Sequence, residues 1–172
     1  MDNPTSREHI VTKSSSDHPD GIVFPPLIFL SALVIACVLQ WLLPLGFIAG
    51  IRDAWRLSAD AFMTIAGLSI MASGRRTLVR HGTNVSPLQP TTALATDGIY
   101  RWTRNPLYVG GTMLMIGIAL VFGLDWLLLL TAPSFSVLHF GVVRQEERYL
   151  DQKFGNTYRR YRDSAPRYVW PI

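Results

Sequence analysis

The sequence predicts an all-α integral membrane protein with about four transmembrane helices, a re-entrant or irregular cytoplasmic loop and a C-terminal amphipathic helix. Three observations support this. Only 16% of the 172 residues are charged while 49% are apolar, against about 25% charged in an ordinary soluble domain. Charges are absent from residues 21–51, 105–124 and 126–143, and uncharged runs of this length are typical of membrane-spanning helices. Residues 144–162 instead place apolar side chains at helical spacing.

The N-terminal 20 residues are polar and rich in Ser, Asp and His. We expect a disordered tail and not a signal peptide, because a signal peptide has only a short basic segment before its apolar run. Residues 21–172 are expected to form a single membrane domain. Its first span is predicted at residues 22–43, with Pro25 and Pro26 in the first helical turn. Cys37 is the single cysteine, so no internal disulfide can form and cysteine usage does not identify the compartment.

The second span is predicted at residues 57–78 and is weaker than the first. Its uncharged centre covers only residues 61–74, so Arg75 and Arg76 must extend toward the membrane surface. The third and fourth spans are predicted at residues 106–123 and 126–143. Because only Leu124 and Asp125 separate them, we expect a tight antiparallel hairpin.

The distribution of basic residues predicts the orientation of the chain. With four spans, 14 of the 16 Lys and Arg residues fall on one side of the membrane. Loops rich in Lys and Arg remain in the cytoplasm. We therefore expect both termini, the loop of residues 75–104 and any site formed there to face the cytoplasm.

The segment after the fourth span carries one apolar face. Leu150, Phe154, Tyr158 and Tyr161 follow one another at intervals of four, four and three residues, which places them on the same side of a helix. Basic residues occupy much of the remaining surface. This pattern predicts a helix that lies on the membrane surface or closes over a site.

The loop from His81 to Asn105 is the first candidate for a functional segment. It contains too many Gly, Pro and Thr residues for a helix, but also aromatic and basic side chains. We expect a functional loop and not a slack connector. It leads into Pro106, predicted as the first residue of the third span, with Asn105 as its N-cap. The free N–H groups of such a turn attract carboxylates and other anions, and Gly110 and Gly111 would let another group approach the backbone. A capped membrane helix with interfacial Arg and Tyr is the alternative.

The second candidate is the sequence Arg144-Gln145-Glu146-Glu147 at the end of the fourth span. Adjacent carboxylates at a membrane exit require cationic or hydrogen-bonding partners. The alternative is a solvated helix start, in which Glu147 pairs with Arg144 or Arg148. His139 lies seven residues before Glu146 and on the same side of the helix, but no pattern of metal ligands accompanies it. We therefore expect no metal, and a hydrogen-bonded role for His139.

Together the two motifs predict a cytoplasmic site for a ligand that carries both charges, such as an amino-acid moiety with ribose hydroxyls. The sequence contains no phosphate-binding loop, dinucleotide fingerprint, serine nucleophile motif or kinase signature. We expect membrane lipids around the chain, and neither a nucleic-acid nor a protein partner.

A series of short motifs carries a resemblance to a known family. In order they are Leu94-x-Thr96-x-Gly98-x-Tyr100, Arg104-Asn105-Pro106-x-Tyr108-x-Gly110, Glu146-Glu147-x-x-Leu150-x-x-x-Phe154-Gly155-x-x-Tyr158-x-x-Tyr161 and Pro166-Arg167. Over residues 57–171 the chain resembles the isoprenylcysteine carboxyl methyltransferase family, which is itself similar to membrane phospholipid N-methyltransferases. The sequence departs from this pattern at two positions. Asn105 replaces the histidine of eukaryotic members, and Ser164 stands where a basic residue is common.

The resemblance implies a small helical membrane enzyme that uses S-adenosylmethionine. It implies that Arg144 and Glu146 are catalytic, with Arg144 contacting the substrate. The residues it assigns to the cofactor are Leu94, Tyr100, Asn105, Pro106, Tyr108 and Glu146. We expect the adjacent Arg104 and Glu147 to bind the cofactor as well.

The expected acceptor is a lipid-like or isoprenoid-like small molecule, methylated on a carboxylate. A carboxylate is ionised at pH 7 and needs no general base. An amine acceptor, as in phospholipid N-methylation, must first lose a proton, and His139 is the one visible candidate for that base. The remaining alternative is a non-catalytic membrane subunit or sensor.

Overall fold

The computed structural model describes residues 24–50, 53–86 and 88–169, and within these ranges every regular element is helical. The predicted tail, residues 1–20, lies outside them. The all-α prediction is confirmed. In chain order the elements are α1 (Pro25–Leu42), α2 (Asp53–Arg80), the 3₁₀ helix η1 (Gly98–Arg101), α3 (Pro106–Phe122), α4 (Asp125–Leu138), the π-helical turn η2 (His139–Val143), α5 (Arg144–Phe154) and α6 (Asn156–Ser164).

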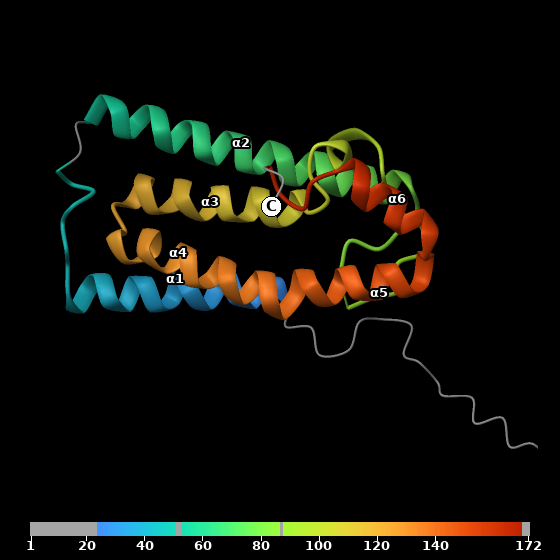
Figure 1. Cartoon of the computed structure of the whole chain (residues 1–172). Helices are drawn as coiled ribbons and strands as arrows, with labels where there is room; N and C mark the ends of the chain where they lie inside the picture. The colour runs from blue at the N-terminus through green and yellow to red at the C-terminus, as the bar shows by residue number, and fades with distance from the viewer. Residues whose placement is uncertain (1–23, 51–52, 87, 170–172) are drawn as a thin grey trace, which may run out of the picture.

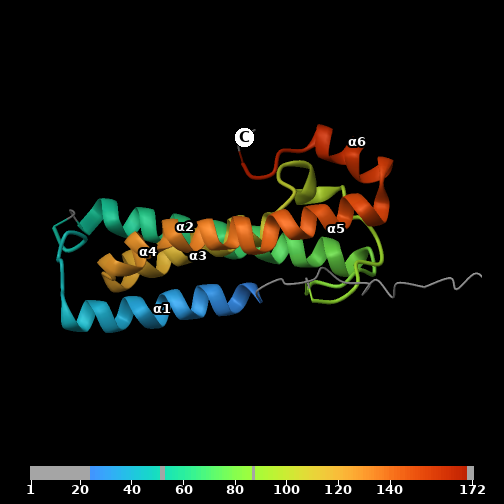
Figure 2. The same ribbon diagram turned by 60° about the horizontal axis from the view of Figure 1, so that its bottom comes forward.

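The first four α-helices form a bundle in which α2 packs on α3, α3 on α4 and α4 on α1. Figure 1 shows α5 continuing the line of α4 past the end of the bundle, while α6 turns back. The irregular loop of residues 81–97, η1, α5 and α6 gather at this end, and the α1–α2 connection lies at the opposite end (Figure 2). The fold therefore brings together the two segments that the sequence singled out.

Among the described residues, three helical stretches are long and apolar enough to cross a membrane: Pro25–Leu42, Leu57–Arg80 and Asp125–Phe154. Helix α3 has 17 residues, which corresponds to about 25 Å against about 30 Å of hydrocarbon. These lengths support the prediction of a membrane-spanning protein, while the number of four spans stays a prediction. The second helix extends beyond its predicted end and includes Arg80.

Glycines allow α2 and α3 to pack closely. A Cβ atom added to Gly67 would lie 2.7 Å from the carbonyl oxygen of Gly110, and one added to Gly110 would lie 2.6 Å from Cγ of Met71. A Cβ at Gly111 would lie 3.0 Å from the ring of Phe29. The groups that approach Gly110 and Gly111 are therefore neighbouring helices. Small residues at such crossings are typical of helix packing in membranes.

Gly67→Ala should destabilise the protein by about 1–3 kcal/mol, because the added methyl group meets backbone that cannot move freely. Thermal unfolding in detergent micelles measures the change. Gly141→Ala is the matched control, since a Cβ at Gly141 has no neighbour within 4 Å. Equal unfolding temperatures for the two variants would contradict the close packing of α2 on α3.

The turn between α3 and α4 differs from the prediction. Gly123 and Leu124 form it, with Gly123 at a φ of 63°, and Asp125 begins α4. The side chain of Asp125 is only 1% exposed. Its carboxylate accepts hydrogen bonds from the backbone N–H of Gly46 at 2.7 Å and of Ile48 at 2.8 Å, and from Nε2 of Gln40 at 3.2 Å. The buried carboxylate of Asp125 thus supplies the acceptor that these backbone N–H groups of the α1–α2 connection require.

The predicted helix over residues 144–162 is two helices, α5 and α6, separated by Gly155. The backbone of Gly155 has a φ of 50°, a conformation in which other residues are strained, and the chain changes direction there. The predicted apolar face still forms one cluster: Tyr158 and Tyr161 pack with Tyr100, and Leu150 and Phe154 lie at its edge.

Candidate functional site

A cavity opens where the loop, the start of α3, α5 and α6 meet. About 750 Å³ of space free of protein atoms lies between its walls, and this figure includes space open to solvent. Leu78, Asn84, Thr91 and Leu150 contribute to its walls. All eight side chains predicted to bind the cofactor line it: Leu94, Tyr100, Arg104, Asn105, Pro106, Tyr108, Glu146 and Glu147.

Tyr108 and Glu146 connect the two sides of the cavity. The Tyr108 hydroxyl donates a hydrogen bond of 2.9 Å to Oε2 of Glu146. Tyr108 is only 8% exposed and packs against Leu138, Val142 and Val143. This packing fixes the phenol, so the hydroxyl can hold the Glu146 carboxylate in one orientation.

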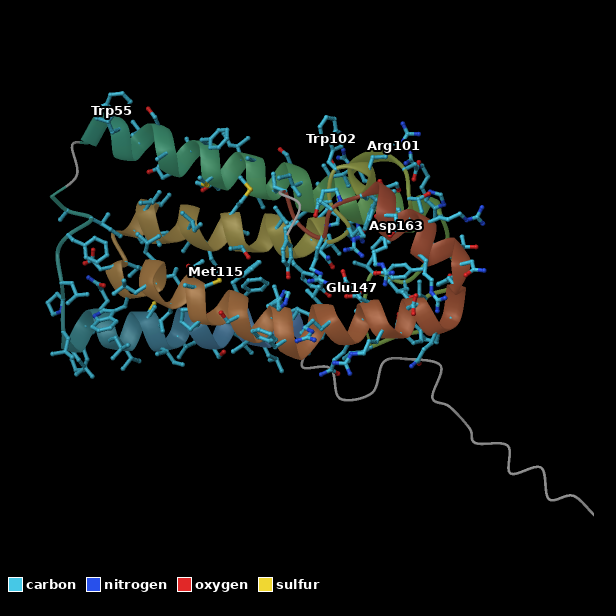
Figure 3. All side chains as sticks on the ribbon, in the orientation of Figure 1. Trp55, Arg101, Trp102, Met115, Glu147 and Asp163 are labelled. Atoms are coloured by element: carbon cyan, nitrogen blue, oxygen red, sulfur yellow. The ribbon has the colours of Figure 1, made fainter. Side chains whose placement is uncertain are left out.

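Glu147 is bound by two arginines from distant parts of the chain. Nη1 of Arg104 lies 3.2 Å from Oε1 of Glu147, and Arg167 donates from Nε at 3.0 Å and from Nη2 at 2.7 Å to the two carboxylate oxygens. The Glu147 side chain is 13% exposed and that of Arg104 is 8% exposed. Figure 3 shows Glu147 in the space between α5 and the elements that face it. The cationic partners that adjacent carboxylates require are Arg104 and Arg167, so the solvated pairing with Arg144 or Arg148 is wrong.

The segment after α6, residues 165–169, returns across the start of α3, and we call it the C-terminal strap. The backbone N–H of Arg104 donates to the carbonyl of Pro166 at 2.9 Å. The carbonyl of Arg167 accepts from Oγ1 of Thr103 at 3.1 Å and from Nδ2 of Asn105 at 3.0 Å. Asn105 occupies the N-cap position of α3 but makes no side-chain capping bond. The prediction that its side chain caps α3 is wrong, because its amide is used to hold the strap.

The loop of residues 81–97 is an ordered part of the cavity wall. Oγ1 of Thr83 accepts the backbone N–H of Thr92 at 3.1 Å, and Nδ2 of Asn84 donates to the carbonyl of Pro90 at 2.8 Å. Asp97 lies 2.7 Å from Nε2 of His81, and this hydrogen bond holds the pKa of the Asp97 carboxyl below its usual range. Its described residues are therefore held in place by hydrogen bonds, while a functional role for the loop stays a prediction.

Arg144 lies apart from the other candidate residues. It is exposed, is not part of the cavity lining, and has its guanidinium carbon 5.7 Å from the centre of the Phe140 ring. His139 is half-buried, and its Nδ1 lies 2.8 Å from the hydroxyl of Tyr168 in the strap. The predicted hydrogen-bonded role of His139 is thus confirmed. Within the described ranges, no group of three or more His, Cys, Asp or Glu residues is placed to hold a metal.

Sequence reasoning did not assign three further residues to the site. The Tyr158 hydroxyl accepts from Nη1 of Arg104 at 3.2 Å, and burial raises the Tyr158 pKa to about 12, so this phenol stays neutral. The Tyr161 hydroxyl donates to the carbonyl of Tyr100 at 2.8 Å. Both tyrosines were part of the predicted apolar face, and Arg167 was part of the Pro-Arg motif. No spacing rule connects Arg167 with Glu147.

One buried donor in the cavity wall lacks a partner. Nε of Arg104 is buried and makes no hydrogen bond to any described residue, which is costly unless a ligand accepts it. Glu146, which also belongs to the lining, offers carboxylate oxygens. A cationic donor such as Arg104 suits the carboxylate of a ligand, and an anionic acceptor such as Glu146 suits its ammonium. The residues present therefore fit the amino-acid end of S-adenosylmethionine.

The family model described as phospholipid methyltransferase matches residues 55–157, more than half of the chain, from the start of α2 to the start of α6. This range contains all eight predicted cofactor residues and Arg144, but not the strap. No curated protein and no solved structure matches the chain.

Proposed function

The chain belongs to the phospholipid methyltransferase family, and on this premise we propose that it transfers a methyl group from S-adenosylmethionine to a lipid-like acceptor in the membrane. The observation that carries the proposal is the cavity itself. Its wall combines the unpartnered Nε of Arg104 with the Tyr108–Glu146 pair, at the end of an apolar helical bundle.

S-adenosylmethionine would supply a methyl group on a positively charged sulfonium centre. Arg104 would bind its carboxylate through Nε, and Glu146, oriented by Tyr108, would accept from its ammonium or ribose hydroxyls. Leu78, Leu94 and other apolar side chains of the lining would face its less polar parts. The task of these residues is alignment and the exclusion of water, which together supply much of the rate enhancement in a displacement reaction.

We propose a carboxylate as the methyl acceptor. His139, the one imidazole considered as a base, is not part of the cavity lining, and its Nδ1 contacts Tyr168. An ionised carboxylate needs no base. Methyl transfer removes both the negative charge of the carboxylate and the positive charge of the sulfonium, and a water-poor site favours such a loss of charge. A phospholipid head-group amine is the second candidate, because the matching family is described as phospholipid methyltransferases.

We further propose that the cavity and both termini face the cytoplasm. Residues of α5 and α6 line the cavity, and these two helices gather at one end of the bundle (Figure 1). Arg75, Arg76 and Arg80 lie in the last turns of α2, and seven further basic residues follow Val143. Basic residues at this end are those expected on the cytoplasmic side, where the water-soluble cofactor is available.

The reaction is tested by incubating the protein in lipid vesicles with methyl-labelled S-adenosylmethionine and extracting the lipids. If alkali treatment releases the label as volatile methanol, the product is a methyl ester. Label that stays in a non-volatile head group after alkali identifies N-methylation and overturns the carboxylate proposal. Absence of label, together with no cofactor binding in calorimetry, would identify a non-catalytic membrane component.

Tyr108→Phe should weaken S-adenosylmethionine binding by about 1–3 kcal/mol, because it removes a hydrogen bond to a charged group. Glu146→Gln should have an effect of the same size, since it removes the charge at the other end of that bond. Isothermal titration calorimetry measures both. Asp163→Asn is the control, because Asp163 is exposed and lies outside the lining. Equal losses in all three variants would show that the cavity is not the cofactor site.

Arg144→Lys should lower turnover of a lipid-like acid while leaving cofactor affinity unchanged. The proposed reason is that the planar guanidinium binds a carboxylate through two parallel hydrogen bonds, which an ammonium cannot reproduce. Steady-state kinetics with the acceptor found by labelling provides the measurement. Unchanged turnover would show that Arg144 only anchors the helix at the membrane surface beside Phe140.

A further inference from the structure

A second hollow lies between η1 and α6. It is lined by Thr96, Arg101, Thr157, Arg160, Tyr161 and Ser164, and we call it the η1–α6 hollow. It is separate from the cofactor cavity and shares only Tyr161 with it. Its lining includes hydroxyl and guanidinium groups, and both are good partners for phosphate oxygens.

The two arginines of the hollow carry positive charges that no described residue neutralises. Neither Arg101 nor Arg160 makes an ion pair with any residue in the described part of the chain. By contrast, the neighbouring Arg159 on α6 pairs with Asp151 at 2.9 Å. Two exposed guanidinium groups without an ion-pair partner among the described residues, beside the hydroxyls of Thr96 and Thr157, therefore form a site suited to an anion.

Exposed tryptophans indicate that the hollow lies at the level of the lipid head groups. Trp55, near the start of α2, is 73% exposed, and Trp102, next to Arg101, is 76% exposed. Figure 3 shows both on the same outer edge of the molecule. Tryptophan is enriched at both membrane–water interfaces. We therefore take Trp55 and Trp102 to lie at the two opposite surfaces of the membrane.

The length of α2 between Trp55 and the level of η1 agrees with the thickness of a bilayer. Helix η1 begins beside Thr77, because a Cβ added to Gly98 would lie 3.2 Å from Oγ1 of Thr77. Thr77 follows Trp55 by 22 residues on α2, a rise of about 33 Å. The hydrocarbon core of a bilayer is about 30 Å thick. Arg101 and Arg160 are thus placed where lipid phosphates lie.

We propose that the η1–α6 hollow binds the head-group phosphate of an anionic phospholipid of the same leaflet. The site is distinct from that of the methyl acceptor and does not depend on the reaction. Anionic lipids attract basic residues at a membrane surface, and the hydroxyls of Thr96 and Thr157 in the lining add hydrogen bonds to the phosphate. The Tyr161 hydroxyl binds the carbonyl of Tyr100 at 2.8 Å, so a lipid in the hollow also braces the wall that separates it from the cofactor cavity.

Native mass spectrometry tests the proposal on the full chain in a neutral detergent. The protein is titrated with phosphatidylglycerol or with zwitterionic phosphatidylcholine, and the fraction that carries a lipid is measured. We expect a clear preference for phosphatidylglycerol, and a loss of about tenfold or more in its affinity for Arg101→Gln/Arg160→Gln, as expected for two basic residues at an anionic surface. Arg148→Gln/Arg162→Gln removes the same charge outside the hollow and should retain the affinity.

Three results would overturn the proposal. The first is equal retention of the two lipids by the parent protein. The second is an equal loss in both double variants, which would indicate only a general effect of net charge. The third is displacement of the lipid by inorganic phosphate at the same concentration, which would identify a site for free phosphate. Because Arg101 and Arg160 are exposed, the variants should fold. The single variants Arg101→Gln and Arg160→Gln, each expected to lose part of the affinity, provide the same comparison.

Discussion

Glu147→Ala should lower the free energy of unfolding by about 3–5 kcal/mol, the usual cost of removing one partner from a buried ion pair. Glu147 neutralises both Arg104 and Arg167, whose side chains are 8% and 29% exposed. Without the carboxylate, two guanidinium groups would face each other in a space with little water. The strap would lose its bidentate attachment, and S-adenosylmethionine binding should weaken as well. Denaturant unfolding in mixed micelles and calorimetry measure the two effects.

The proposed cause is tested by a graded series at this position. Glu147→Gln keeps hydrogen-bond acceptors but not the charge, so its unfolding free energy should lie between those of the parent and the alanine variant. Asp163→Ala removes an acid from an exposed pair, in which Nε of Arg162 and Oδ1 of Asp163 are 4.0 Å apart, and should leave stability unchanged. A Glu147→Ala protein as stable as the Asp163→Ala protein would contradict the role of the ion-pair network.

Asp125→Ala should be destabilising to a similar degree at the opposite end of the molecule. The variant leaves the N–H groups of Gly46 and Ile48 without their acceptor. Each buried group that loses its partner costs about 1–3 kcal/mol, so we expect a loss of at least about 2 kcal/mol in unfolding free energy. The same micelle unfolding experiment gives the value.

Asp125→Asn and Ser136→Ala are the comparisons for this variant. Asparagine retains one oxygen acceptor and should lose less stability than alanine. The exposed Ser136 hydroxyl donates only to the carbonyl of Ala132 in its own helix, so its removal should have little effect. If Asp125→Ala unfolds like Ser136→Ala, the carboxylate does not hold the α1–α2 connection.

The sequence by itself determined the helical architecture and the approximate helix ends. Long uncharged runs predicted α1, α3 and α4 because a bilayer excludes charges and demands that every backbone group be paired within the helix. Pro106 marked the start of α3 for an equally local reason, since its ring suits the first helical turn. The motif series, together with the resemblance that it carries, also selected eight residues that the structure brings to one cavity.

The tertiary structure alone decided which distant groups meet. Arg167 binds Glu147, and Asn105 holds the strap, because the chain turns at Gly155 and returns across α3. Arg144, which the sequence placed with Glu146 in one motif, lies outside the cavity lining, since neighbouring residues point to different sides of a helix. Asp125 looked like a turn residue and is buried by partners about 80 positions upstream. Such pairings depend on where the backbone returns in space, and no local pattern of residues encodes that path.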